Sequence, residues 1–275
     1  MVLLQTQEPY EIWDMHGHIY PEKIAAKAAQ TIGEFYGMPM RYAGSAEELA
    51  ASGGRIGLTR QLVCSCATTP AQVHSINTFI AQECKAHPQF IGFGTLHPDM
   101  ENVEEEARRI IALGLVGVKL HPDFVRFQID TPRALELYRV VSAYRLPVLF
   151  HTGDKRFDFS SPRRLANALD KVPALVAIAA HFGGYTEWEH VAGYLIRPNV
   201  YFDTSSTLFA LSAERAAELL RVLGTDRFFF GVDFPMWDHS EELARFDRLP
   251  LTEKERRAIL SENARRFLRE HAPIT

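Results

Sequence analysis

The sequence predicts an α/β protein, a (β/α)8 TIM barrel in which eight parallel strands are surrounded by helices. Short apolar runs alternate with amphipathic helical patterns eight times along the 275 residues. The runs are apolar almost throughout, as expected of strands buried on both faces, and alternating βα units form parallel sheets. Eight such units favour a closed barrel, which at this length commonly forms one domain. We therefore expect a single domain over residues 1–275.

Each predicted strand is followed by a helical pattern. The apolar runs are, in order, EIWDMHGH, RQLVCSC, FIGFGTLHP, VGVKLHP, PVLFHTG, LVAIAAHFGG, VYFDTSS and RFFFGVDFP. The helical patterns cover 21–37, 70–87, 102–114, 131–145, 161–172, 185–196, 212–224, 241–248 and 252–271. The least regular stretches are 39–58, 122–131 and 152–161. The first run lacks a Gly-rich phosphate fingerprint after it, which also weighs against an open nucleotide-binding sheet.

The composition is that of a globular protein with an ordinary core. Hydrophobic residues make up 47% and charged residues 23%, and the net charge of −4 comes without the clustered Lys and Arg of a nucleic-acid binder. The three cysteines, Cys64, Cys66 and Cys84, are too few for a disulfide framework and fit a reducing compartment. The sequence shows neither a signal peptide nor an apolar stretch long enough to span a bilayer. We expect a cytoplasmic protein that acts on a small molecule, without nucleic-acid or membrane partners, and a homodimer is left open.

Polar residues gather where the predicted strands end, which is where barrels of this type have their active sites. Asp14, His16 and His18 alternate along the first strand and should therefore share one face. Six of the eleven histidines close apolar runs, and the strand ends carry His16, His18, His97, Lys119, His121, His151, His181, Asp203 and Asp233. A single histidine in such a place is usually a hydrogen-bonded structural residue, as we expect for His97, and Asp203 could simply position its neighbours. Together they predict a divalent metal site, with zinc favoured and manganese or iron as alternatives.

Five motifs carry a family resemblance. DMHGH, LFHTG, AAHFGG, FGVDFP and ILSENARRFL occur in this order from the first strand to the last helix. Together they resemble the amidohydrolase superfamily, and within it the amidohydrolase-2 branch that includes aminocarboxymuconate-semialdehyde decarboxylase. The resemblance implies one metal ion held by His16, His18, His151 and Asp233. It also implies that His181 orients or activates a metal-bound water, so that His181 and Asp233 are the catalytic residues.

Lys119 has two interpretations. On the fourth strand it faces the same way as His121, and we favour an ammonium that faces the substrate. Some members of the superfamily instead carry a carboxylated lysine on this strand, which bridges two metals. The branch that this sequence resembles is mononuclear, and we therefore expect one ion per chain.

The remaining candidates concern the substrate and the reaction. Arg126 and Arg156 follow the fourth and fifth strands and could bind an anion, while Trp237 and His239 follow the eighth and could wall the pocket. With Lys119 and His121 they form the predicted substrate-binding set. We expect metal-dependent hydrolysis of a small anionic substrate, which needs only Asp233 and His181 as proton carriers. Decarboxylation, which also needs a cation for the departing carboxylate, is the alternative, and a non-catalytic metal-binding barrel is a third.

Overall fold

Eight short parallel strands pair in chain order and form the barrel that the sequence predicts. The structure is a computed structural model that describes residues 10–273. The strands are β1 (Trp13–His18), β2 (Arg60–Cys64), β3 (Phe90–Thr95), β4 (Gly117–Leu120), β5 (Val148–Phe150), β6 (Ala177–Ala179), β7 (Val200–Asp203) and β8 (Phe228–Phe229). Each strand is followed by at least one helix, which is the connection that parallel neighbours require.

Backbone hydrogen bonds between β1 and the segment after β8 close the ring. The amide of Met15 donates to the carbonyl of Phe230 (2.9 Å), and the amide of His18 donates to that of Phe234 (2.7 Å). In the other direction, the amide of Asp233 donates to the carbonyl of His16 (2.7 Å). The first strand and the Asp233 segment are therefore neighbours, although His16 and Asp233 are 217 positions apart in the sequence.

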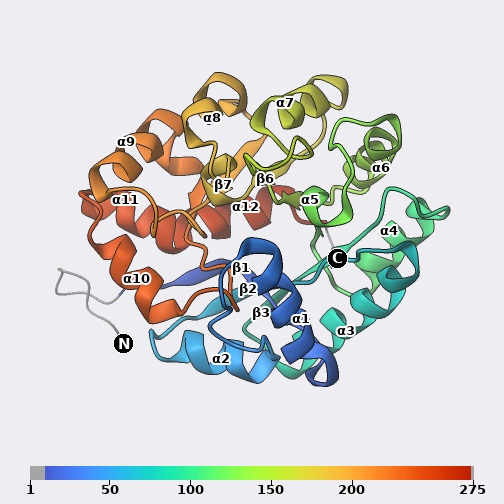
Figure 1. Cartoon of the computed structure of the whole chain (residues 1–275), viewed down its shortest axis with the longest axis horizontal. Helices are drawn as coiled ribbons and strands as arrows, with labels where there is room; N and C mark the ends of the chain where they lie inside the picture. The colour runs from blue at the N-terminus through green and yellow to red at the C-terminus, as the bar shows by residue number, and fades with distance from the viewer. Residues whose placement is uncertain (1–9, 274–275) are drawn as a thin grey trace.

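Most helices follow the sheet around its outside in chain order, as the colours of Figure 1 show. They are α1 (Glu22–Tyr36), α2 (Ala46–Gly54), α3 (Val73–Ala86), α4 (Val103–Ala112), α5 (Pro122–Val125), α6 (Pro132–Ala143), α7 (Pro162–Lys171), α8 (Trp188–Leu195), α9 (Ala213–Leu223), α10 (His239–Asp247), α11 (Glu253–Arg257) and α12 (Asn263–His271). Short 3₁₀ turns cover Pro70–Gln72, His181–Gly183 and Thr225–Arg227, and a π turn at Ala258–Glu262 joins α11 to α12. No helix within residues 10–273 is both long and apolar enough to cross a membrane.

The stretch 39–58 is more regular than its sequence suggests, because it contains α2. Ser45 caps this helix in a capping box: its side chain accepts from the amide of Glu48, and the Glu48 carboxylate accepts from the amide of Ser45. The Ser-x-x-Glu spacing is a known signal for a helix start. It was the available clue to this helix.

The core has two layers, one inside the barrel and one between the barrel and its helices. Alternate residues of each strand point inward, so that Leu62, Phe93, Leu149 and Ile178 fill the barrel interior. Phe267 of α12 joins this inner cluster. The outer layer is formed by the alternate strand residues and the buried faces of the helices.

An irregularity in β1 separates two side chains that the sequence analysis places on one face. Asp14 pairs with Gln61 and Gly17 with Val63, so three steps along β1 match two along β2. Because side chains alternate along a strand, the extra residue reverses the facing direction. Asp14 therefore contacts His239 of α10 on the helix side, while His16 contacts Lys119 on β4. The prediction that Asp14 shares a face with His16 and His18 is wrong.

Candidate metal centre

Three side chains from the two ends of the chain meet at the carboxyl end of the barrel. The Nε2 atoms of His16 and His18 lie 3.2 Å apart. Oδ1 of Asp233 lies 3.6 Å from the first of these nitrogens and 3.5 Å from the second. The three ligand atoms all fall within 4.8 Å of one another, close enough to surround a single ion.

The residues behind His16 fix which of its nitrogens faces this point. Nδ1 of His16 lies 2.8 Å from Oδ2 of Asp203 and 3.1 Å from Oγ of Ser205. A carboxylate only accepts hydrogen bonds, so Nδ1 carries the proton and the lone pair is on Nε2. Nζ of Lys119, which only donates, lies 3.0 Å from Nε2 and fits this tautomer. Asp203 thus orients His16 as carboxylates orient metal-binding histidines elsewhere.

The orientation of Asp233, like that of His16, is fixed by its neighbours. Its backbone has a φ of 65°, in the left-handed region that non-glycine residues rarely adopt. Ser206 donates to its Oδ2 (2.5 Å), which leaves Oδ1 directed at the two histidines. Burial alone would raise the pKa of Asp233, but the electrostatic interaction with the neighbouring His16 and the hydrogen bond with His18 hold this pKa well below its usual value. The carboxylate is therefore ionised, as ligation requires.

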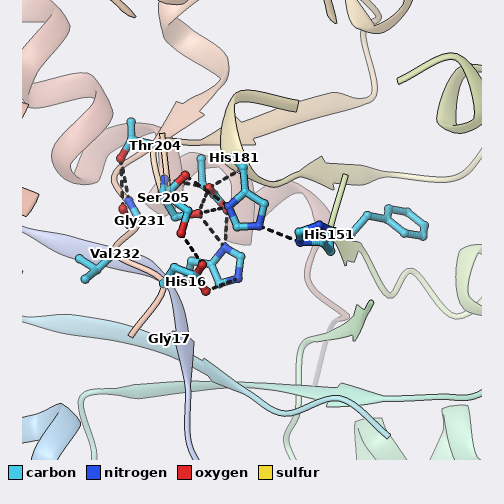
Figure 2. A network of polar contacts seen from close by, with 12 residues as sticks. His16, Gly17, His151, His181, Thr204, Ser205, Gly231 and Val232 are labelled. Atoms are coloured by element: carbon cyan, nitrogen blue, oxygen red, sulfur yellow. Dashed lines mark hydrogen bonds and ion pairs between the residues drawn. The ribbon is translucent and has the colours of Figure 1, made fainter. Parts of the chain in front are cut away.

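Five imidazole rings lie in a contiguous row across this end of the barrel, and three of them are labelled in Figure 2. The centroid distances are 5.2 Å from His18 to His16, 5.2 Å from His16 to His181, 4.8 Å from His181 to His151 and 4.0 Å from His151 to His121. Burial lowers the pKa of His18 and of His181 to about 4 and holds the pKa values of His121 and His151 well below 6.5. These four rings are neutral near pH 7, the form in which imidazole binds a metal.

His181 presents an open nitrogen towards the row. Its Nδ1 lies 3.3 Å from the carbonyl oxygen of Ser205, which only accepts, so Nδ1 carries the proton. Its amide donates to Oδ1 of Asp203 (3.0 Å), which ties this turn to the residue that orients His16. The lone pair on Nε2 then faces Nδ1 of His151 at 3.0 Å, along the dashed contact in Figure 2. His181 can therefore accept a proton within the site.

His151 lies beside His181 and contacts a carboxylate on its other side. Its Nε2 is 3.8 Å from Oδ2 of Asp123, beyond hydrogen-bond distance. In residues 10–273, that Nε2 and Oδ1 of Asp123 are among the buried polar atoms without a hydrogen-bond partner. Burial raises the pKa of Asp123 to about 7. Because the lone pair on Nε2 of His181 faces Nδ1 of His151, Nδ1 carries the proton of His151, and its Nε2 keeps a lone pair without a partner among the described residues. The assignment of His151 as a metal ligand stays a prediction.

His121, Asp123 and His151 also lie within 4.8 Å of one another. The rings of His121 and His151 are nearly parallel, at 9°, and stacked at 4.0 Å. Because the lone pairs of an imidazole lie in its ring plane, two stacked rings cannot both aim at one ion. Nδ1 of His121 also accepts from the amide of Phe124 (3.2 Å), and its Nε2 donates to the hydroxyl of Tyr36 (2.9 Å). His121 is therefore committed to the protein, and the fit for an ion is better at His16, His18 and Asp233.

A cavity of about 520 Å³ opens over the row of rings. Its floor is polar and includes His18, Lys119, His121, His151, His181 and Asp233. Its walls come mainly from α1 and α3. The donor set of imidazoles and one carboxylate at the bottom of a cavity fits a divalent metal that a small molecule can reach.

Comparison with known proteins identifies the family. The amidohydrolase family profile matches residues 13–269, which is most of the chain. The chain belongs to the amidohydrolase family. No curated protein matches this amidohydrolase closely enough to be informative.

Solved structures share the fold at low sequence identity. An uncharacterised TIM-barrel protein from Bordetella bronchiseptica is 22% identical, with a TM-score of 0.76 over 95% of this chain and 99% of the other. A dihydroxybenzoic acid decarboxylase from Polaromonas, solved with manganese and an inhibitor, is 16% identical, with a TM-score of 0.73 over 94% and 97%. A probable 2-pyrone-4,6-dicarboxylic acid hydrolase from Acinetobacter baumannii is 16% identical, with a TM-score of 0.68 over 93% and 98%. The amidohydrolase thus shares its barrel with decarboxylases and with a hydrolase.

The two predicted anion-binding arginines lie outside the cavity. Arg126 is exposed, at the end of α5, and does not line the cavity. Arg156 binds Asp154 through Nε and Nη2, donates to the carbonyl of Phe35 (2.6 Å) and lies 4.8 Å from the Phe35 ring centroid. It ties the loop after β5 to α1. The interpretation of Arg126 and Arg156 as substrate-binding residues does not agree with this geometry.

Trp237 and His239 also do not line the cavity. Trp237 donates to Oγ of Ser206 (2.9 Å), the residue that holds Asp233, so it supports the site from behind. His239 is fully buried between β1 and α2, where Nδ1 lies 2.8 Å from Oγ of Ser52 and Nε2 lies 3.1 Å from Oδ2 of Asp14. With both nitrogens engaged by the protein, His239 is a structural residue.

Other residues at the site escaped the sequence analysis or received only a minor role there. Asp203 and Ser205 orient His16, and Ser206 holds Asp233; the polar run after the seventh strand, FDTSS, was the available signal. Tyr36 contacts His121 from α1, which no strand-end pattern could indicate. His97, expected to be structural, accepts from the amide of Asp99 (3.1 Å) and does not line the cavity.

Proposed function

We propose that this amidohydrolase is a metal-dependent hydrolase that adds water to a small carbonyl substrate. The observation that carries the proposal is that an ionised Asp233 and a neutral His181 line one cavity, and that Oδ1 of Asp233 lies 3.6 Å from Nε2 of His16 and 3.5 Å from Nε2 of His18. A divalent ion there, zinc in our proposal, would polarise the carbonyl and acidify water. Manganese, which a structural neighbour holds, is the second choice of ion.

The chain supplies two places for the protons of this reaction. Asp233 is ionised and lies beside the candidate ligand nitrogens, so its carboxylate can accept a proton from water. Nε2 of His181 carries a lone pair, and a proton taken there can be passed to the leaving nitrogen or oxygen. Neither step requires a cation beyond the metal, in agreement with the outward position of Arg126 and Arg156.

Decarboxylation is the second candidate, and Lys119 favours it. Its ammonium is fully buried, lines the cavity and donates to Nε2 of His16 (3.0 Å). Such a cation can bind a carboxylate next to the metal ligands. The decarboxylases among the structural neighbours show that this barrel supports the reaction in other proteins.

Product analysis separates the two reactions. Metal-loaded protein is incubated with lactones, amides and aromatic or unsaturated carboxylic acids in ¹⁸O-labelled water. We expect one ¹⁸O atom in the carboxylic acid that hydrolysis forms, none in the leaving amine or hydroxyl group, and no CO₂. We expect the His181→Asn variant to lose this activity while keeping its metal. Release of CO₂ without incorporation of ¹⁸O would establish decarboxylation and overturn our first choice.

A further inference from the structure

The helix α1 carries an apolar stripe that faces the cavity instead of the protein core. Ile24, Ala28, Ile32 and Tyr36 are spaced by four residues and therefore lie along one face of the helix, and all four line the cavity. The core is contacted by a different stripe, which consists of Ala25, Ala29 and Gly33. Ile24 is 51% exposed at the cavity, a costly position for a large aliphatic side chain unless something covers it.

The side of the cavity formed by α3 is also mainly apolar, although Gln72 and Ser75 line it as well. Ile76 and Phe79 lie three residues apart on one face of α3, and Met40 and Met236 add flexible thioether side chains. An apolar body between α1 and α3 would therefore contact side chains on both sides. The apolar walls end below at the polar floor that holds the candidate metal ligands.

Positive charge in the cavity is confined to two positions. The lysines that line it are Lys119, buried in the floor, and Lys27, exposed on α1, and arginine is not among the lining residues of the described chain. If His16 binds an ion with Nε2, it no longer accepts a hydrogen bond from Lys119. The ammonium of Lys119 can then donate to another acceptor. An anionic or carbonyl oxygen next to the metal ligands is the partner that it fits.

We propose that the cavity selects substrates with one anionic or carbonyl head, bound at Lys119, and an uncharged apolar body held between α1 and α3. The substrate class is therefore a monoacid or an acid derivative with an alkyl or aryl body, in contrast to a dicarboxylic acid. This inference rests on the proposed function for its location, since it names the substrate class of the same site. It does not depend on whether the bond broken is C–O, C–N or C–C.

Two acids of equal length test this selection through binding alone. Octanoate and octanedioate differ only in the far end, which is a methyl group in the first and a carboxylate in the second. Calorimetric titration of the metal-loaded protein should show octanoate binding at least about tenfold more tightly, because the second carboxylate would be desolvated between apolar walls. Equal or tighter binding of octanedioate would overturn the proposal. If Lys27→Met then removed that binding, Lys27 would be identified as a second anion anchor.

Variants locate the bound body and head. Ile32→Thr and Ile76→Thr make the two walls shorter and more polar, and each should weaken octanoate binding about three- to tenfold. Ile196→Thr, at an exposed isoleucine outside the cavity, is the matched control and should leave binding unchanged. Lys119→Met should weaken binding more than tenfold while the metal content is retained. Unchanged affinity in both wall variants, with thermal unfolding showing that they fold, would contradict the proposed place of the body.

The same titrations keep this inference separate from the proposed reaction. If product analysis found decarboxylation, octanoate binding and its loss in the wall variants would still support the substrate class. If hydrolysis were found but octanedioate bound as well as octanoate, the reaction would stand and the substrate class would fall.

Discussion

Two clusters with the same residue types lie on opposite sides of β1. The inner cluster consists of His16, Asp203 and Ser205, and the outer cluster consists of His239, Asp14 and Ser52. In each, a buried histidine contacts a carboxylate and a hydroxyl: His16 Nδ1 lies 2.8 Å from Asp203, and His239 Nε2 lies 3.1 Å from Asp14. The clusters differ in how the contacts are divided between the ring nitrogens.

In the inner cluster both partners contact Nδ1, so the lone pair on Nε2 of His16 faces His18, Asp233 and Lys119. In the outer cluster one partner contacts each nitrogen, and His239 keeps no lone pair for an ion. The difference shows that the residue types alone do not make a metal site. What decides is which ring nitrogen the protein leaves available. The irregularity in β1 between Asp14 and Gly17 places Asp14 and His16 on opposite sides of the strand.

The largest effect should follow from removing both histidines of the candidate metal site, His16 and His18. We expect the His16→Ala, His18→Ala double variant to lose its bound metal and all metal-dependent activity, because Asp233 would be left as one carboxylate with a single oxygen directed at the ion. Elemental analysis after dialysis measures the loss. Full metal occupancy in this variant would remove His16 and His18 from the site.

A smaller effect should follow at His181, which faces the site without being required for the ion. His181→Asn should reduce turnover about 10²–10⁴-fold, the usual contribution of a general acid–base group. Metal content measured on the same sample should stay at the wild-type level. An unchanged turnover number with the metal intact would exclude His181 from proton transfer.

The comparison of the two clusters becomes sharper when each is changed alone. Asp203→Asn should weaken metal binding about 10–100-fold, the usual cost of losing the carboxylate that orients a ligating histidine. His239→Gln should leave metal affinity unchanged and lower the free energy of unfolding by about 1–3 kcal/mol, through buried groups that lose a partner. Competition with a chromogenic chelator and urea denaturation measure the two quantities. Equal metal affinities in Asp203→Asn and His239→Gln would contradict the distinction between the clusters.

The smallest effect is a pH dependence of stability in the metal-free protein. Burial lowers the pKa of His18 from 6.5 to about 4. As the pH falls, the unfolded chain therefore takes up this proton first, and the folded state loses stability between about pH 6.5 and pH 4. Relative to His18→Gln, the wild type should lose on the order of 2 kcal/mol between pH 7.5 and pH 5. The exposed His190→Gln is the control, and a parallel pH profile for His18→Gln and the wild type would contradict the burial of His18 as a neutral ring.

The sequence predicts the barrel and the residues at its strand ends, because both follow from local patterns. Apolar runs mark the strands, and parallel strands bring their carboxyl ends together, so His16, His18, His151, His181 and Asp233 were identified without knowledge of contacts. Their assignment as ligands and catalytic residues stays a prediction. The fold itself and the amidohydrolase family are confirmed.

The predictions that were wrong concern where side chains point, which local sequence patterns do not determine. A single added residue in β1 turned Asp14 away from His16, and strand alternation gives no sign of it. Arg156 was expected to reach the substrate, yet Asp154 two residues earlier binds it instead. The cavity walls depend on how α1 and α3 pack over the barrel, which is tertiary structure. The sequence patterns therefore predicted the polar residues at the floor of the cavity but not the apolar residues of its walls.

Anomalous diffraction from crystals of the zinc-loaded protein is the most direct test of whether His16, His18 and Asp233 hold the metal ion. Data collected on both sides of the zinc absorption edge locate the ion without reference to any assignment. We expect one ion per chain, within bonding distance of Nε2 of His16, Nε2 of His18 and Oδ1 of Asp233, at about 2.0–2.2 Å. Zinc bound instead between Asp123 and His121, with these three atoms free of metal, would contradict it.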